Sequence, residues 1–348
     1  FKNAQFWNYT RMALKVVDGK SIIFDKSLFV NCFYFRIFAS LERSAVSMSV
    51  INSKFYKCFS TLVIQRLSTQ PTQKKNARLE KINPRQIKKP FENIQVNLIN
   101  TTFISLQSGI YIKSIFAKDS AFGIRVYASR CFFFNIYLTT KSYCLSVAFV
   151  NHVFLSQNKF IHINAIQGGT TKLLNIQSVE ILNNVFDLNI GSVGGILIVQ
   201  NAAFVESVNN SFKDNFMKTF GGTISMTNIN SMLILNSVFS NNVVNDRGAG
   251  INLYQCNYVV IKQISMKNNY ARRLGGGIYL NHGNDCEIVH CVFLNNKGRN
   301  KGGVLYIKLV NSVQCINNSF INNHINEYGG GLYITNSLSF TSNFTMFL

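Results

Sequence analysis

Three glutamates recur at one position of a repeating pattern and are the first candidates for acid–base chemistry. Glu180, Glu206 and Glu287 each stand six residues before a recurring phenylalanine. Two carboxylates on neighbouring strands, about 4.8 Å apart, could share a proton or bind a cation. The position alternates with apolar ones, which predicts side chains that point to solvent. Polysaccharide chemistry needs a larger acidic cluster than this, so we assign no catalytic residue.

The other groups that bind metals or act as nucleophiles do not cluster in the sequence. The five histidines show no metal-ligand spacing. Cys286 and Cys315 fall on neighbouring repeats but two residues out of register, too far apart for a disulfide, and we expect them to be small buried hydrophobic residues. Four further cysteines have no place in the pattern: Cys32, Cys58, Cys131 and Cys144. We therefore expect neither a metal nor a cofactor.

Basic residues collect in the polar stretch that precedes each glycine pair of the C-terminal half. They are Lys218, Arg247, Arg272, Arg273, Lys297, Arg299 and Lys301. If the repeats stack, these side chains form a stripe along one edge that could meet an anionic partner. The alternative is a solvated corner that prevents side-on aggregation, and the sequence leaves both interpretations open.

The elements that position these residues follow from a repeat of 26 to 28 residues. A glycine opens an apolar run at Gly169, Gly195, Gly222, Gly250, Gly277, Gly303 and Gly331. A phenylalanine column follows at Phe186, Phe212, Phe239, Phe293 and Phe320, with Met266 in the remaining repeat. Three residues later comes an asparagine column: Asn189, Asn215, Asn242, Asn269, Asn296 and Asn323. A fixed period of this size indicates stacked units that bury their apolar faces against one another.

Within each repeat, apolar and polar residues alternate with a period of two and β-branched residues are frequent, which predicts strands rather than helices. A length of about 27 residues suits one turn of three short strands. We therefore predict an all-β fold, a single-stranded right-handed parallel β-helix. We also expect two structural amide ladders at buried corners. One is the asparagine column; the other lies three residues before the phenylalanine, at Asn183, Asn209, Asn236, Gln263, His290 and Asn317.

The paired motifs G-G-[AILV] and F-x-x-N resemble the repeats of the chlamydial polymorphic outer-membrane proteins, within the pectin-lyase-like superfamily. They occur together as Gly194-Gly195-Ile196 with Phe212 and Asn215, and again as Gly302-Gly303-Val304 with Phe320 and Asn323. The resemblance covers residues 160–348. It implies a β-helix and, by family, adhesins, surface proteins and some polysaccharide enzymes.

The pattern loosens before residue 160, although some offsets persist. The pairs that keep an offset are Asn52–Phe55, Asn100–Phe103, Phe132–Asn135 and Asn151–Phe154. We predict irregular coils over residues 1–65 and 93–160, and regular coils over 161–348 that are truncated at the C-terminal end. Residues 66–92 hold all three prolines and many basic residues, and are predicted to be a loop or insertion.

The formal net charge is +21, concentrated in the first 130 residues. No aromatic–basic motif of a nucleic-acid-binding domain accompanies it, so we expect no specific nucleic-acid partner. No apolar stretch in this fragment is long enough for a transmembrane helix.

The regular repeat and the missing site chemistry favour a non-enzymatic, structural or adhesive rod. We expect it to be part of a larger protein at a cell surface or extracellular face. Its partners would be other proteins of an assembly, with an anionic glycan or an acidic protein surface as candidates for the basic stripe. The alternative is a carbohydrate-active enzyme or carbohydrate-binding module of the pectin-lyase-like fold, which would need an acidic cluster built by the irregular N-terminal coils.

Overall fold

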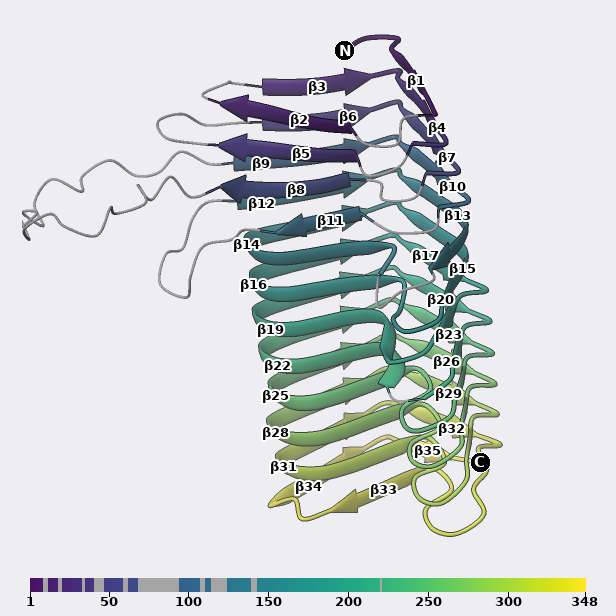
Figure 1. Cartoon of the computed structure of the whole chain (residues 1–348). Helices are drawn as coiled ribbons and strands as arrows, with labels where there is room; N and C mark the ends of the chain where they lie inside the picture. The colour runs from purple at the N-terminus through teal and green to yellow at the C-terminus, as the bar shows by residue number, and fades with distance from the viewer. Residues whose placement is uncertain are drawn as a thin grey trace, which may run out of the picture.

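The computed structural model describes most of the chain, in eleven segments. They are residues 1–8, 12–17, 21–32, 35–40, 47–58, 62–67, 94–106, 110–113, 124–138, 143–219 and 221–348. Within them the chain forms strands, turns and bends but no helix. Every strand pairing in these segments is parallel, and the strands stack from one end of the molecule to the other (Figure 1).

The longer strands form one sheet along the stack. Its members are β2 (Met12–Val17), β3 (Ser21–Asp25), β5 (Phe35–Ser40), β6 (Ser47–Ile51), β8 (Leu62–Leu67), β9 (Ile94–Ile99), β11 (Ile110–Lys113), β12 (Ile124–Ser129), β14 (Leu145–Ser156), β16 (Thr171–Leu182), β19 (Gly194–Val208), β22 (Gly221–Leu235), β25 (Ile251–Lys262), β28 (Ile278–Val289), β31 (Leu305–Ile316), β33 (Leu332–Thr335) and β34 (Ser339–Asn343). β14 pairs with both β11 and β12, so the two separate strands of the earlier coils become one long strand from β14 to β31.

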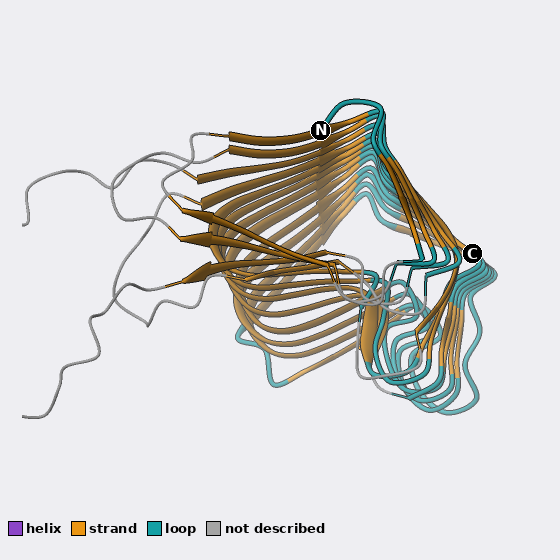
Figure 2. Cartoon of the chain, turned by 45° about the horizontal axis from the view of Figure 1, so that its top comes forward, coloured by secondary structure: helices purple, strands orange, loops and turns teal. Residues whose placement is uncertain are grey.

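The shorter strands form the other sheet. Its members are β1 (Gln5–Trp7), β4 (Leu28–Val30), β7 (Lys54–Tyr56), β10 (Thr102–Ile104), β13 (Phe132–Leu138), β15 (Lys159–Ala165), β17 (Val185–Asp187), β18 (Ile190–Gly191), β20 (Ser211–Lys213), β21 (Phe216–Met217), β23 (Val238–Ser240), β24 (Val243–Val244), β26 (Ser265–Lys267), β27 (Tyr270–Ala271), β29 (Val292–Leu294), β30 (Lys297–Gly298), β32 (Ser319–Ile321) and β35 (Met346–Phe347). The two sheets enclose the core. Figure 2 shows the successive coils superposed, with loops gathered at the corners.

Left-handed backbone conformations make the bends within each coil. In the coil built from β19, β20 and β21, the bends lie at Asn201, Asn209 and Asp214, with φ angles of 56°, 55° and 51°. Asparagine and aspartate adopt this conformation more readily than other residues with a side chain. The sequence thus turns the chain at fixed positions of every coil, which confirms the predicted parallel β-helix.

A column of stacked phenylalanines fills the centre of the coils. The predicted members are buried and stack on their neighbours, with centroids 4.8 Å apart for Phe186 and Phe212 and 4.9 Å for Phe212 and Phe239. Met266 takes the position between Phe239 and Phe293. The column also extends in both directions beyond the predicted set, through Phe6, Phe29, Phe55, Phe103, Phe133, Phe160 and Phe347.

Two of the irregular coils were misread in the sequence. Phe133, not Phe132, belongs to the central column. Phe154 is half-buried on β14, where it pairs with Tyr127 and Glu180, and Phe160 takes the central position of that coil. An N-x-x-F spacing alone therefore does not identify the inward-facing ring.

The insertion predicted at residues 66–92 begins inside a strand. Residues 66 and 67 end β8, and the rest of that segment lies outside the described residues. The coils around it are nevertheless in register, because Asn100 donates a hydrogen bond to Asn52 across 48 residues, compared with 26 or 27 in the regular coils.

Candidate functional site

The predicted asparagine column forms an internal hydrogen-bond ladder. Each side-chain Nδ2 donates to the carbonyl of the central-column residue one coil earlier, as from Asn215 to Phe186 at 2.9 Å; for Asn296 that residue is Met266. Each Oδ1 accepts the backbone N–H of the residue at the same position one coil earlier, as Asn215 accepts from Asn189 at 3.1 Å and Asn189 from Ile163 at 3.0 Å. Asn189 to Asn296 are buried and Asn323 is half-buried, so the ladder satisfies interior polar groups and offers no accessible amide surface.

The second predicted ladder was placed one residue too early. The six residues of that column are all exposed, and each has a positive φ. A left-handed residue at the bend turns its side chain outward, and the next residue points into the core. The buried ladder is therefore at Asn158, Asn184, Asn210, Ser237, Cys291 and Asn318, with Ile264 in one coil.

The three glutamates lie in one column of the sheet, as predicted, but they do not form an acidic cluster. Glu180 and Glu206 pair directly on neighbouring strands, whereas Glu287 lies three coils further along. All three are half-buried on the outer side of the sheet. Glu180 Oε1 lies 3.7 Å from His152 Nε2, and Glu287 Oε2 lies 3.6 Å from Lys262 Nζ. Two of the three carboxylates thus stand beside a basic side chain.

All eight cysteines are buried and none is in a disulfide. Cys286 is paired with Val313 and Cys315 with Ile288, which confirms the predicted two-residue offset. Burial raises the pKa of Cys315 to about 12 and that of Cys291 to about 11. These thiols are neutral hydrophobic side chains at neutral pH. The four cysteines that the pattern could not place have the same buried environment.

The predicted basic residues meet at one corner, between the two-residue strands and the start of the long strands, but not in one stripe. Lys218, Arg272 and Arg299 each follow the end of a two-residue strand, β21, β27 and β30, and therefore share a column. Arg247 and Lys301 share a second column with one residue between them. The stripe predicted from the sequence is thus divided into parallel columns.

A buried aspartate anchors part of this corner. Asp246 has a side chain that is 8% exposed; it contacts Arg247 Nε at 3.1 Å and Arg273 Nη1 at 3.2 Å. Arg247 also donates to the Tyr279 hydroxyl at 3.0 Å. Burial opposes the charge of Arg247, but Tyr279 and Asp246 outweigh it and raise the pKa above the usual value. Both arginines are thus paired with the buried Asp246, although the Arg273 side chain is itself exposed.

The other cations of the corner face outward. Lys218, Arg272, Lys297 and Arg299 are exposed, and none forms an ion pair with a carboxylate among the described residues. Lys301 is half-buried, with its Nζ 5.2 Å from the centre of the Tyr333 ring. This outward-facing set, Lys218, Arg272, Lys297 and Arg299, is called the basic corner below.

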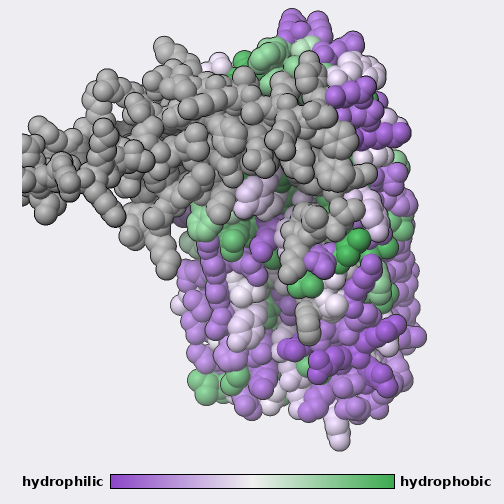
Figure 3. Space-filling view, viewed as in Figure 1, coloured by the Kyte–Doolittle hydropathy of each residue, from purple (hydrophilic) through white to green (hydrophobic). Residues whose placement is uncertain are grey.

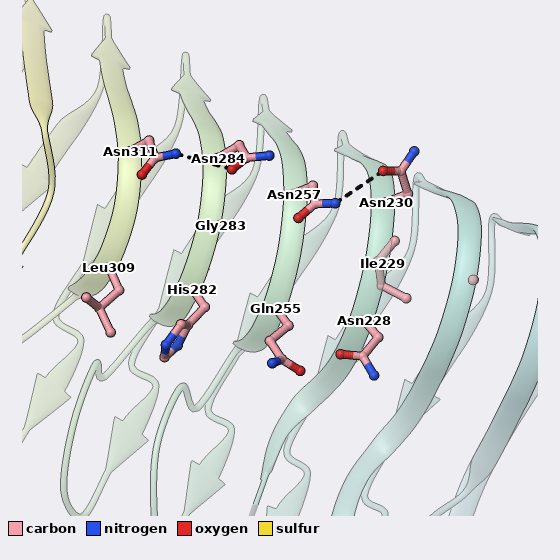
Figure 4. A pocket seen from close by; sticks show the side chains of 11 residues that line it. Asn228, Ile229, Asn230, Gln255, Asn257, His282, Gly283, Asn284, Leu309 and Asn311 are labelled. Atoms are coloured by element: carbon pink, nitrogen blue, oxygen red, sulfur yellow. Dashed lines mark hydrogen bonds between the residues drawn. The ribbon is translucent and has the colours of Figure 1, made fainter.

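A second surface feature was missed in the sequence. Each long strand bends at its middle, and the side chains around the bends of β22, β25, β28 and β31 line an open groove of about 590 Å³ (Figure 4). We call it the amide groove. One row is Asn228, Gln255, His282 and Leu309, and the other is Asn230, Asn257, Asn284 and Asn311. The sequence does contain a regularity that could have indicated the groove. The two rows lie at constant offsets, eleven and nine residues, before the central-column residue of each coil.

Two kinds of feature are absent from the described residues. No group of three or more His, Cys, Asp or Glu is arranged to hold a metal ion there. No helix in that part of the chain has the length and apolar character needed to cross a membrane.

Comparison with known proteins extends little beyond the fold. No family model matches the chain, and no curated protein matches it. Among solved structures, the periplasmic alginate epimerase AlgG is similar, with a TM-score of 0.44 and 11% sequence identity. The match covers 92% of this chain and 78% of the epimerase. The chain is therefore placed in the class of all-β parallel solenoids by its own strand pairing.

Proposed function

We propose that this chain is a non-enzymatic structural rod that presents its sides to other proteins, as part of a larger surface or extracellular assembly. The observation that carries the proposal is the continuity of the internal ladders. In the regular coils the amide ladder links each coil to the next in register, as between Asn215 and Asn242, and stacked rings add to this wherever both coils carry phenylalanine, as at Phe212 and Phe239. A coil cannot shift sideways without breaking both, so surface residues keep a fixed spacing along the rod.

The basic corner is the contact surface of this rod. Its column of Lys218, Arg272 and Arg299 places positive charge on three of four successive coils, about 4.8 Å apart, with the neutral Asn245 between Lys218 and Arg272. Acidic side chains of a partner would gain from several such charges at once and would be steered toward them. An acidic protein surface is the proposed partner, and a sulfated glycan is the other anion that would fit.

The surroundings of the corner are compatible with lateral contact. Below the region drawn in grey, the visible face is mainly hydrophilic with scattered hydrophobic residues (Figure 3). A polar surface of this kind suits an interface held by charge. The resemblance of the repeats to those of chlamydial outer-membrane proteins supports the same assignment to a surface or adhesive role.

Cross-linking mass spectrometry on the native assembly tests the proposal. We expect reproducible links from Lys218 and Lys297 to one partner protein. The double variant Arg272→Glu/Arg299→Glu should remove these links, because it reverses the charge of the corner. The matched control Lys213→Glu/Lys267→Glu makes the same change of charge at two other exposed basic residues, on β20 and β26, and should leave the links intact.

Two outcomes would count against the rod. If no lysine links to another protein, the scaffold role is wrong. If the purified chain releases reducing ends or unsaturated products from a polysaccharide, the enzyme alternative takes its place.

A further inference from the structure

The outer face of the short strands changes its character along the stack. Strands β1, β4, β7, β10, β13 and β15 pair in this order down one side of the molecule (Figure 1). The second residue of each strand is the central ring, so the third residue lies on the outer face. In these six strands the third residue is apolar or aromatic, and we call the set the apolar column: Trp7, Val30, Tyr56, Ile104, Phe134 and Ile161. The same position in the next four coils holds Asp187, Lys213, Ser240 and Lys267.

Aromatic rings are gathered in the apolar column and beside it. Trp7 is 53% exposed, and Tyr56 and Phe134 are half-buried. Phe132, the first residue of β13, adds a ring whose centre lies 5.5 Å from that of Phe134. The equivalent three-residue strands from β17 to β32, all of which the structure describes, have no aromatic residue on this face. Accessible rings that gather in one part of a surface are typical of a contact site.

Basic residues flank the apolar column. Five exposed cations lie on these strands or at the bends next to them: Lys26, Lys54, Lys57, Arg130 and Lys159. None of the five forms an ion pair with a carboxylate among the described residues. Lys57 Nζ lies 5.2 Å from the centre of the Tyr56 ring, so charge and ring are adjacent.

Acidic residues are absent from the six strands themselves, all of which are described. Asp25 lies at the edge of this face, where it ends β3 and accepts a hydrogen bond from Asn52 Nδ2 at 3.3 Å. The face is therefore both apolar and positively charged.

This combination suits the surface of an anionic bilayer. Tryptophan and tyrosine favour the boundary between acyl chains and headgroups, and nearby lysine and arginine are attracted to anionic headgroups. The rings lie in one straight column of a sheet, with cations at the bends on either side, as at Arg130 and Lys57. An acidic protein surface would pair with the cations, but it would place polar groups against the rings. The rings therefore favour lipid.

We propose that the outer face of strands β1 to β15 binds an anionic lipid bilayer. The apolar column enters the boundary of the acyl chains, and the five cations lie among the headgroups. Because the column runs along the axis of the β-helix, these coils lie flat on the membrane. The surface is on other coils than the basic corner, so it adds a lipid partner to the rod and does not depend on the proposed protein partner.

The single tryptophan of the chain, Trp7, belongs to this surface and reports on it directly. We expect the purified full chain to sediment with vesicles of phosphatidylcholine and phosphatidylserine in equal amounts, but not with vesicles of phosphatidylcholine alone. Added salt should weaken binding, because it screens the headgroup charge. The Trp7 emission should shift to shorter wavelength, and brominated phosphatidylcholine in the anionic vesicles should quench it. These optical signals separate contact through this face from attraction of the +21 chain through its other basic residues.

Two matched double variants test the cations. Lys54→Glu/Lys159→Glu reverses two charges beside the apolar column and should weaken binding to the anionic vesicles by about tenfold or more. Lys213→Glu/Lys267→Glu makes the same change of charge on the same sheet face in later coils, again at exposed lysines. This control should keep the Trp7 shift and lower the affinity much less.

Three results would overturn the proposal: the anionic vesicles do not bind the chain, they bind without shifting the Trp7 emission, or the two double variants lose affinity equally. Poly-L-glutamate tests the other kind of partner. If it binds the chain while the vesicles do not, and Lys54→Glu/Lys159→Glu abolishes that binding, the face is a site for an acidic protein and not for lipid. None of these results alters the cross-linking test of the basic corner, whose cations lie on other coils.

Discussion

The Oδ1 atom of Asn242 accepts two hydrogen bonds from Asn215, one from its backbone N–H at 3.1 Å and one from its Nδ2 at 3.0 Å. The same Asn242 amide donates to the carbonyl of Phe212 at 3.0 Å. One buried side chain therefore satisfies the backbone of two different residues in the preceding coil. This arrangement makes the ladder cooperative, because each amide completes the bonding of its neighbour.

Replacing Asn242 with alanine should be costly for that reason. Asn242→Ala removes the acceptor of the Asn215 N–H and the donor to the Phe212 carbonyl, and both groups are buried. Each unsatisfied group costs about 1–3 kcal/mol, so we expect the two together to lower the free energy of unfolding by about 2–6 kcal/mol. Urea denaturation followed by circular dichroism measures it. Asn230→Ala is the control: Asn230 is exposed and not left-handed, and its loss should cost less than about 0.5 kcal/mol.

The regular half of the fold could be predicted from the sequence because the same large residue recurs at the same position in almost every repeat. The ring column from Phe186 to Phe320 is an example. Phe133 and Phe160 were not identified as members of this column from the sequence. In their coils the asparagine three residues later is replaced by Ile136 and Ile163, which are buried at the same position. The core there accepts an apolar side chain in place of the amide, so the motif is lost while the packing is kept.

The sites were harder to predict than the fold. Asn183 and Asn184 are adjacent and identical in type, yet one is exposed and the other is buried. Only the backbone conformation separates them, with a φ of 57° at Asn183. For the same reason the amide groove could not be distinguished from the other asparagine columns, since its concavity depends on how the long strands bend. Likewise, Arg247 and Arg273 were predicted to belong to a binding stripe. Their ion pairs with Asp246 form only in the folded coil, where that aspartate is buried, so the sequence did not reveal them.

Close contact between coils at the glycine pairs leads to a second prediction. A Cβ added at Gly303 would collide with the backbone carbonyl of Gly330 in the next coil, and backbone cannot move aside cheaply. Gly303→Ala should therefore lower the stability by several kcal/mol, as expected for overpacking against a rigid neighbour. At Gly330 the nearest atom to an added Cβ is 3.6 Å away, so Gly330→Ala should be close to neutral. Equal melting temperatures for the two variants would contradict the close packing at Gly303.

The central ring column should tolerate a change of shape better than a loss of volume. Phe239 is fully buried, and Phe239→Ala should cost about 3–5 kcal/mol because it opens a cavity between two coils. Phe239→Met should cost less than about 1.5 kcal/mol, since Met266 already occupies this position in the next coil. Thermal denaturation of both variants distinguishes them. Comparable losses would mean that ring stacking, rather than filled volume, stabilises the column.

Buried thiols should make the fold sensitive to alkali. Burial raises the pKa of Cys291 from about 9 to about 11, so the folded state holds this proton more tightly than the unfolded state does. The resulting stability is fully present below pH 9 and is lost as the pH rises from 9 toward 11, by up to about 2 kcal/mol for this thiol.

Serine can replace this cysteine without disturbing the column. Ser237 stands at the equivalent position two coils earlier, where its Oγ donates to the Leu235 carbonyl at 3.0 Å, and the Cys291 Sγ contacts the Val289 carbonyl in the same way. Cys291→Ser should therefore fold normally at pH 7.5 and lose less stability than the wild type between pH 9 and pH 10.5 in urea titrations. If the two proteins lose the same amount, ionisation of Cys291 is not coupled to unfolding, and the alkaline sensitivity must come from other groups.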